Sequence, residues 1–244
     1  MIEVSAAVLT NEPLTEDIYK LKLQTPEIAA GVQAGQFVHL EVPGFSLRRP
    51  FTVADAENGA ITLIIRRQGR GTEALEQTKA GDAIQVLGPL GNGFRPMPGR
   101  TLLLGGGIGA AALTLLARRL DRCTLVMGGR SAAELWLDDL DLPATVDIQY
   151  ATDDGSRGFA GNLVQYAKEY LTPGMWVAAC GPQPMLAGLQ SLLLQQDIPG
   201  QFALEARMAC GLGACMGCTC KTKSGHALVC KDGPVFAAEE VALT

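Results

Sequence analysis

Residues 101–130 read TLLLGGGIGAAALTLLARRLDRCTLVMGGR, and they indicate the fold class more clearly than any other stretch. An apolar run at 101–104 leads into a glycine-rich turn, then into a helical stretch ending near Arg119, then into a second apolar run at 123–127. Parallel strands covered by helices on both faces read as continuous apolar runs of this kind. The stretch therefore predicts the start of a doubly wound parallel sheet.

The same alternation of strand and helix continues to residue 202. VDIQYAT at 146–152 precedes NLVQYAKEYL, and MWVAACG at 175–181 precedes PMLAGLQSLLLQQ. Ser131 and Glu134 have the spacing of a capping box, which predicts that SAAELWLDDL is also a helix. We expect one α/β nucleotide domain over 97–202, with GNGFRPMPGR at 91–100 as the linker before it.

Residues 4–88 follow a different period. Tyr19, Leu21 and Leu23 alternate with polar residues, and the stretches 37–42 and 61–65 do the same. Short runs of period two, separated by turns such as GVQAG and KAGD, are typical of half-buried antiparallel strands. They predict a small antiparallel barrel over 1–96.

Composition excludes several classes of function. The chain has 244 residues, a net charge of −5 and 48% hydrophobic residues, which argues against a nucleic-acid-binding surface and for a globular protein. Residues 170–196 carry no charge, but prolines and glutamines interrupt them, so we expect no membrane span. The start lacks the pattern of a secretory signal and the seven cysteines are an odd count, which favours metal or redox use of cysteine in a cytoplasmic protein.

The last segment, 203–244, holds five of the seven cysteines and has little apolar sequence for a core of its own. Four of them have the plant-type 2Fe–2S spacing C-x4-C-x2-C with a distant fourth ligand: Cys210, Cys215, Cys218 and Cys230. The glycines between them would let the loop wrap a cluster. Structural zinc is the alternative, although zinc ribbons usually bring two short cysteine pairs far apart. We interpret Cys220 as a bystander and Cys123 as a small core residue.

Two motifs in the predicted barrel indicate a flavin. The first is Arg49, Pro50, Phe51 and Thr52, in which the arginine can pair with a phosphate and the threonine can reach the ring. The second supplies an apolar edge, a cation and a Gly-Thr turn that opens a helix: Ile64, Ile65, Arg66, Gly71 and Thr72. The alternative for the first motif is that Arg48 and Arg49 are a solvated pair before a strand.

Two further motifs indicate a nucleotide at the carboxyl ends of the parallel strands. A strand-to-helix turn that could admit a pyrophosphate contains Gly105, Gly106, Gly107 and Gly109. Because Ala112 replaces the last glycine of G-x-G-x-x-G, a purely structural turn is the alternative. The second motif ends the fourth strand with Cys180, Gly181 and Pro182, and we expect Cys180 near a nicotinamide rather than as a nucleophile.

The order of these parts resembles the ferredoxin–NADP reductase superfamily and, within it, the electron-transfer subunits of class 1B dihydroorotate dehydrogenases. The narrowest matches are E-x-R-M-A-C-G-x-G-A-C-x-x-C at 205–218, C-x-D-G-P-V-F at 230–236 and DDGS at 153–156. The resemblance implies bound FAD, one 2Fe–2S cluster and NAD. It also implies an FMN-containing catalytic subunit that oxidises dihydroorotate in pyrimidine (UMP) biosynthesis, in a heterotetramer of two copies each. Thr52 stands where the family more often has serine, and Ile65 where an aromatic residue is common.

Electron counting orders these cofactors. A nicotinamide accepts a hydride, a cluster passes single electrons, and a flavin does both, so FAD must lie between them. We identify no catalytic residue, because no side chain has the pattern of a general base for dihydroorotate. The alternatives are a stand-alone NAD(P)H reductase that feeds an oxygenase or ferredoxin, and a zinc-stabilised regulatory module. Arg130, 21 positions after Gly109, favours NADP, whereas the resemblance favours NAD, which we expect.

Overall fold

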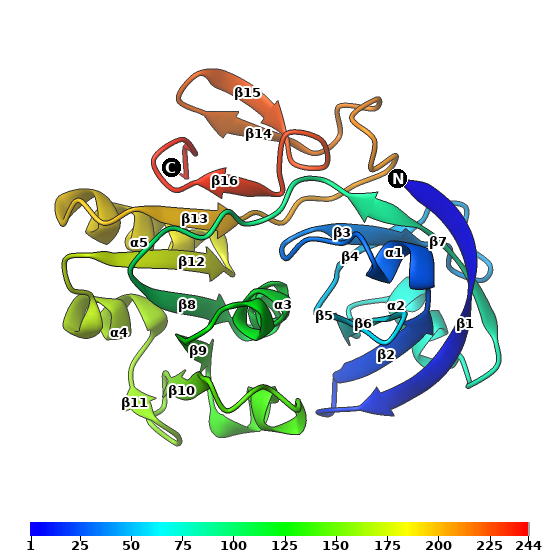
Figure 1. Cartoon of the computed structure of the whole chain (residues 1–244), viewed down its shortest axis with the longest axis horizontal. Coiled ribbons are helices and arrows are strands. Elements are labelled where there is room, and N and C mark those ends of the chain that lie inside the picture. The colour runs from blue at the N-terminus through cyan, green and yellow to red at the C-terminus, as the bar shows by residue number, and fades with distance from the viewer. Residues whose placement is uncertain (244) are drawn as a thin grey trace.

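The computed structural model describes residues 1–243 as two seven-stranded sheets that lie side by side, with the end of the chain across one edge of both (Figure 1). The first sheet is built from the strands before residue 91, and the second from the strands after residue 99. The expected order of a β-rich part followed by an α/β part is confirmed.

The first sheet is antiparallel throughout and runs in the order β4-β3-β7-β1-β2-β6-β5. Its strands are β1 (Ile2–Pro13), β2 (Ile18–Gln24), β3 (Phe37–Leu40), β4 (Arg49–Thr52), β5 (Asp55–Glu57), β6 (Ala60–Arg66) and β7 (Ala83–Leu90). Two short helices, α1 (Pro26–Ala29) and α2 (Arg70–Glu76), complete this part. The strands curl around a buried apolar core into a half-barrel, as the period-two pattern predicts.

The second sheet runs in the order β11-β10-β9-β8-β12-β13-β16, and all its pairs are parallel except the last. Its strands are β8 (Arg100–Gly106), β9 (Cys123–Gly129), β10 (Val146–Thr152), β11 (Phe159–Ala160), β12 (Met175–Cys180), β13 (Gly200–Ala203) and β16 (Val235–Ala237). The main helices are α3 (Ala111–Arg119), α4 (Leu163–Tyr170) and α5 (Gln183–Gln195). Strand order reverses between β8 and β12, the position where open α/β sheets bind ligands.

The prediction of a helix over 131–140 is wrong. The chain instead makes two 3-10 turns, Ala132–Glu134 and Leu137–Asp139, and the Ser131 side chain caps neither. Trp136 and Leu137 are both fully buried, so consecutive side chains point inward and the backbone does not present one apolar helical face. Glu134 accepts from the Arg130 side chain instead, with Nε 2.5 Å from Oε1.

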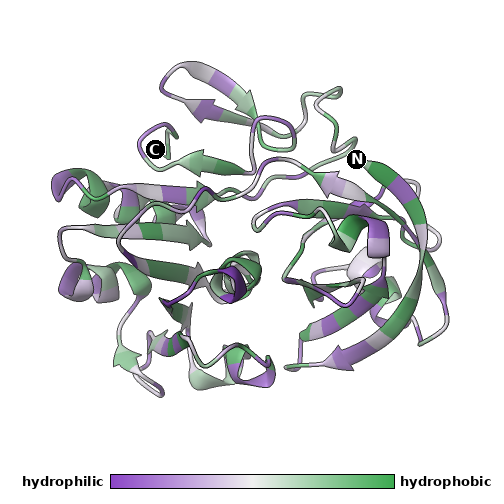
Figure 2. Cartoon of the chain, in the orientation of Figure 1, coloured by the Kyte–Doolittle hydropathy of each residue, from purple (hydrophilic) through white to green (hydrophobic). Residues whose placement is uncertain are grey.

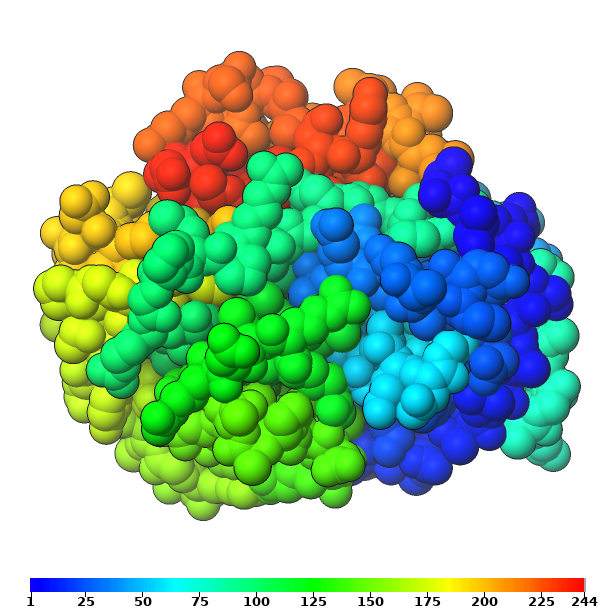
Figure 3. All heavy atoms as spheres, in the orientation of Figure 1, coloured from blue at the N-terminus to red at the C-terminus, as the bar shows by residue number. Residues whose placement is uncertain are grey.

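The end of the chain joins the second sheet. Strands β14 (Thr219–Thr222) and β15 (Gly225–Leu228) form a hairpin, and β16 then pairs antiparallel with β13. Val229 and Phe236 pack in the same apolar cluster as Phe202 of β13. The segment thus shares the core of the α/β part, and Figure 3 shows it as a cap over the upper edge of the molecule.

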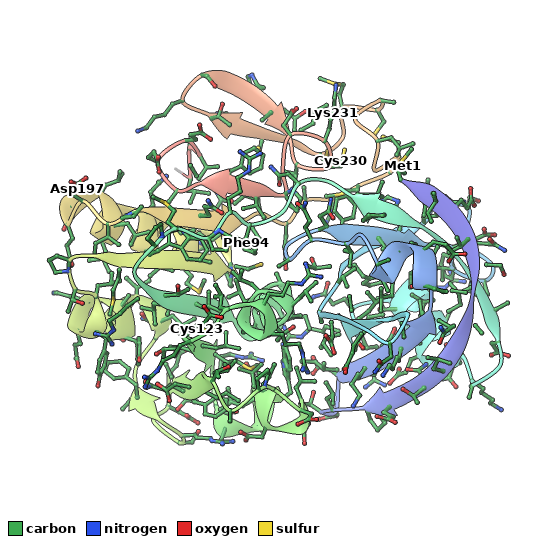
Figure 4. All side chains as sticks on the ribbon, viewed as in Figure 1. Met1, Phe94, Cys123, Asp197, Cys230 and Lys231 are labelled. Carbon is green, nitrogen blue, oxygen red and sulfur yellow. The ribbon has the colours of Figure 1, made fainter. Side chains whose placement is uncertain are left out.

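Helix α3 fixes the two sheets against each other. The Thr114 hydroxyl donates to the Ala54 carbonyl at 2.6 Å within the buried interface, and Arg119 donates to the Val32 carbonyl at 2.9 Å. Phe94, in the connection between β7 and β8, is buried between the two parts (Figure 4). Hydrophobic residues are concentrated on the central strands of the second sheet (Figure 2). Within residues 1–243, no helix is long and apolar enough to cross a bilayer.

Candidate functional site

A first cavity of about 470 Å³ lies between the two sheets, within the size range of cofactor sites. It is lined by nine of the residues predicted to bind a cofactor: Pro50, Phe51, Thr52, Ile64, Ile65, Arg66, Thr72, Gly109 and Cys180. The half-barrel supplies an apolar wall from β4 and β6, and the second sheet supplies the opposite wall. The structure therefore brings both predicted flavin motifs to one place.

Arg49 and Gly71, which were also predicted to bind the cofactor, do not line this cavity. A Cβ on Gly71 would lie 3.1 Å from the Arg49 Nε, so the guanidinium packs directly on the start of α2. Arg49 is held there by donating to the Leu47 carbonyl at 2.7 Å. A cation beside the free N–H groups of a helix start is an arrangement that attracts a phosphate.

A second cavity of about 460 Å³ opens at the carboxyl ends of the parallel strands. Of the predicted residues it is lined by Arg66, Gly106, Gly107, Gly181 and Pro182. Gly105 lines neither cavity, and Gly109 lines the first one only. Both glycines also permit close packing, because a Cβ would meet the Ala110 Cα at 2.4 Å in the first case and the Cys180 carbonyl oxygen at 2.5 Å in the second. The glycines thus let β8, β12 and the turn that follows β8 approach closely.

Four residues line both cavities, so the two spaces meet there: Arg66, Gln68, Ile108 and Glu205. Glu205 is exposed toward these cavities, but desolvation by the surrounding protein raises its pKa, and the positive charge of Arg66 opposes that shift. Burial and the nearby Glu205 raise the pKa of the Cys180 thiol, which is 3% exposed. Cys180 is therefore an uncharged thiol in the wall, which argues against a nucleophilic role.

The four predicted metal ligands lie in one loop region, where backbone N–H groups donate hydrogen bonds to cysteine sulfurs. Figure 4 labels one of the four, Cys230. The Cys210 Sγ accepts from the N–H groups of Leu212 and Cys215, both at 3.4 Å, and the Cys230 Sγ accepts from that of Gly213 at 3.1 Å. The Leu212 N–H is the largest influence that lowers the pKa of the Cys210 thiol, to about 6. Burial raises the pKa of Cys230 to about 12, so metal binding must displace a proton there.

Backbone hydrogen bonds link the cysteines in two pairs: the Cys215 N–H donates to the Cys210 Sγ and the Cys230 N–H donates to the Cys218 Sγ, both at 3.4 Å. Within the described chain, no three His, Cys, Asp or Glu side chains surround a single point as one metal ion would require. A two-iron cluster needs two cysteines on each iron, which two separate pairs supply. Cys220 lies on β14, half-buried among hydrophobic side chains.

Known proteins match the chain over its whole length. A family model for the iron–sulfur cluster binding domain of dihydroorotate dehydrogenase B matches residues 205–242, and one for the oxidoreductase FAD-binding domain matches residues 6–94. The dihydroorotate dehydrogenase B (NAD+) electron transfer subunit of Caldanaerobacter subterraneus is 35% identical and covers 98% of both chains. That of Geobacillus kaustophilus is 37% identical over 97% of both. The chain belongs to the dihydroorotate dehydrogenase B electron transfer subunits.

Solved structures support the same grouping. The structure of an NADH-dependent reduced ferredoxin–NADP oxidoreductase has a TM-score of 0.87 and 28% identity, and the match covers 98% of this chain and 90% of that one. The ferredoxin reductase in carbazole 1,9a-dioxygenase has a TM-score of 0.70 and 27% identity over 82% of this chain and 68% of that one. Membership of the electron transfer subunit family confirms the predicted oxidoreductase class and its flavin and iron–sulfur parts.

Sequence reasoning missed several residues of this electron transfer subunit's cavities. The first cavity is also lined by Phe37, Gln68, Ile108, Ala111, Ala112, Leu204, Glu205, Ala206, Arg207, Met208 and Pro234. Glu205 belongs to the motif at 205–218, but the sequence pattern assigned it no role of its own. The available signal was its position after the carboxyl end of a parallel strand, where ligands bind. Phe37 carried no signal, because a strand of four buried residues does not reveal which face borders a cavity.

Proposed function

We propose that this protein carries electrons from the FMN of a dihydroorotate dehydrogenase catalytic subunit, through a 2Fe–2S cluster and FAD, to NAD+ in cytoplasmic pyrimidine (UMP) biosynthesis. The observation that carries the proposal is the position of the first cavity, which lies between the second cavity and the cysteine segment. It meets the second cavity at Arg66 and Glu205. On the other side its wall runs through Met208, two residues before Cys210.

Three parts of the chain divide this work: a FAD-binding barrel at 1–96, an NAD-binding α/β part at 97–202 and a cluster-binding part at 203–244. The pairing of β16 with β13 supports close coupling of the last two parts. Arg49 and the start of α2 would hold the FAD pyrophosphate, and the walls from β4 and β6 would hold its ring. The turn after β8 and the residues after β12 would hold NAD, and the four cysteines would hold the cluster.

When bound, FAD supplies the exchange between single electrons and a hydride. The chain's own residues orient the two rings and exclude water where the cavities meet. Glu205 and Arg66 place a carboxyl group and a positive charge at the junction, and the apolar β6 residues Ile64 and Ile65 line the ring site. The proton abstraction from dihydroorotate belongs to the catalytic subunit, which we propose binds in a heterotetramer of two copies each.

Cofactor content tests this proposal. We expect the purified chain to hold about two iron atoms, two acid-labile sulfides and one FAD, because four cysteines bind one 2Fe–2S cluster and one cavity fits one flavin. Iron, sulfide and flavin analysis of the same sample provides the measurement. A colourless protein with one zinc and no sulfide would instead support the zinc-stabilised module.

A stand-alone reductase is the second candidate, favoured by the likeness to the ferredoxin reductase in carbazole 1,9a-dioxygenase. Such a protein would share every cofactor and would reduce a ferredoxin or oxygenase without a dihydroorotate-oxidising partner. Capture of an FMN-containing subunit from native cells would favour the main proposal, and rapid ferredoxin reduction by the isolated chain would favour the second.

We expect NADH to be used in preference to NADPH. Arg130 lines the second cavity, but its guanidinium is paired with Glu134, and Asp153 adds a second negative charge to the same cavity. A 2′-phosphate would therefore face carboxylates and an arginine that is already paired. The variant Glu134→Gln should raise kcat/KM for NADPH relative to NADH by about tenfold, since a freed arginine can pair with the phosphate.

Steady-state kinetics with both nucleotides measure this ratio. Glu169→Gln is the matched control, because Glu169 is an exposed carboxylate on α4 outside both cavities. A wild-type kcat/KM higher for NADPH than for NADH would contradict the expectation.

A further inference from the structure

His39 is a buried polar side chain that the electron path described above does not use. It lies on β3 with 1% exposure, and its Nε2 is buried without a hydrogen-bond partner within the described structure. Leaving such a nitrogen unpaired costs about 1–3 kcal/mol, and native proteins rarely do so. Burial, together with the positive charge of Arg48, lowers the pKa of His39 to about 4, so the imidazole is neutral. The missing partner is therefore a group that the protein chain itself does not supply.

The position of His39 indicates where that partner lies. Residues of β3 alternate, so Val38 and Leu40 fill the core of the half-barrel while Phe37 and His39 face away from it. Phe37 lines the first cavity, and its ring centroid is 5.7 Å from that of His39. His39 thus stands next to the wall of the proposed flavin site.

The unpaired edge of the ring faces the cysteine loop. A Cβ on Gly211 would lie 2.7 Å from the His39 Cε1 and 2.8 Å from its Nε2, closer than side chains approach each other. Gly211 directly follows Cys210 and has a φ of +69°, which glycine adopts without strain. Gly211 therefore lets the loop that carries the first predicted ligand pack closely against the His39 ring of the half-barrel.

We propose that the His39 Nε2–H donates a hydrogen bond to a sulfur of the cluster bound beside Cys210, and so acts as a positioning residue that raises the cluster's reduction potential. This inference rests on the proposed function. The Cys210 Sγ already accepts two backbone N–H groups, and His39 adds a donor from the half-barrel toward a sulfur that the chain itself does not supply. Because reduction adds negative charge to the cluster, each donor to its sulfurs stabilises the reduced form more than the oxidised form.

Isotope labelling tests the contact in the unmodified protein. The chain has two histidines, His39 and the exposed His226 on β15. In protein grown with ¹⁵N-histidine and then reduced, pulsed EPR of the cluster should detect a weak ¹⁵N coupling. The coupling should disappear in His39→Gln and remain in the matched control His226→Gln.

A redox titration tests the effect of the contact. His39→Leu removes the donor and should reduce the equilibrium constant for one-electron reduction of the cluster by about tenfold, which equals 59 mV. His39→Gln keeps an N–H donor and should recover at least half of that shift. The FAD potential should change in neither variant.

The outcomes separate the inference from the proposed function. A wild-type protein without a 2Fe–2S EPR signal would contradict the proposed function itself. A wild-type cluster without ¹⁵N coupling would overturn the role of His39 alone, and so would an unchanged cluster potential in His39→Leu. If His39→Leu does not retain its cluster, the labelled wild-type spectrum decides.

Discussion

Cys215→Ser should abolish the iron–sulfur cluster. Cys215 is exposed at the tip of the loop and pairs with Cys210, so its loss leaves one iron with a single cysteine ligand. We expect iron and acid-labile sulfide to fall at least tenfold, while FAD content is unchanged because the first cavity is lined by other residues. Metal analysis and the visible spectrum of the purified variant measure this loss.

The same variant should destabilise the end of the chain. Within 205–217 only Gly211 is buried, so cluster binding contributes to the folding of this loop. Limited proteolysis should cut Cys215→Ser within 205–218 much faster than the wild type. Cys123→Ser and Cys220→Ser are the controls, because Cys123 lies on β9 and Cys220 lies on β14 within the hairpin, and neither is a predicted ligand. A Cys215→Ser protein with full iron content would contradict the ligand assignment.

The isolated chain should oxidise NADH with ferricyanide but leave dihydroorotate untouched. The two joined cavities supply a path from a nicotinamide to a flavin, whereas the site that removes a proton from dihydroorotate is assigned to the partner. We expect ready turnover of NADH and no measurable turnover of dihydroorotate. Assays of both reactions on one preparation, free of other subunits, provide the measurement. Orotate formation by the chain alone would refute the division of labour between the subunits.

Sequence pattern predicted most of the fold, because both of its main signals are local. The glycine turn at 105–109 and the apolar runs on either side of it report a β–α–β unit within about thirty residues, and period two reports the half-barrel strands. The stretch 131–140 was mispredicted for the same reason. Capping-box spacing is local, whereas burial of Trp136 and Leu137 depends on distant packing.

The site was harder to predict where distant segments meet. The pairing of β16 with β13 and the contact of Gly211 with His39 join parts of the chain that are about 35 and about 170 residues apart. Motif spacing identified the cysteines and the glycine turns, but it could not show that Glu205 borders two cavities. A single carboxylate carries no periodic signal, and its role follows only from the junction that folding creates.

Electron delivery in the assembled enzyme is the most direct test of the whole relay. With the FMN-containing catalytic subunit bound, dihydroorotate should reduce NAD+ to NADH in equal amounts under anaerobic conditions. The complex that carries Cys215→Ser should still form reduced FMN from dihydroorotate yet make almost no NADH, because the proposed route from FMN to FAD is broken. Undiminished NADH formation by that cluster-free complex would contradict the relay through the 2Fe–2S cluster.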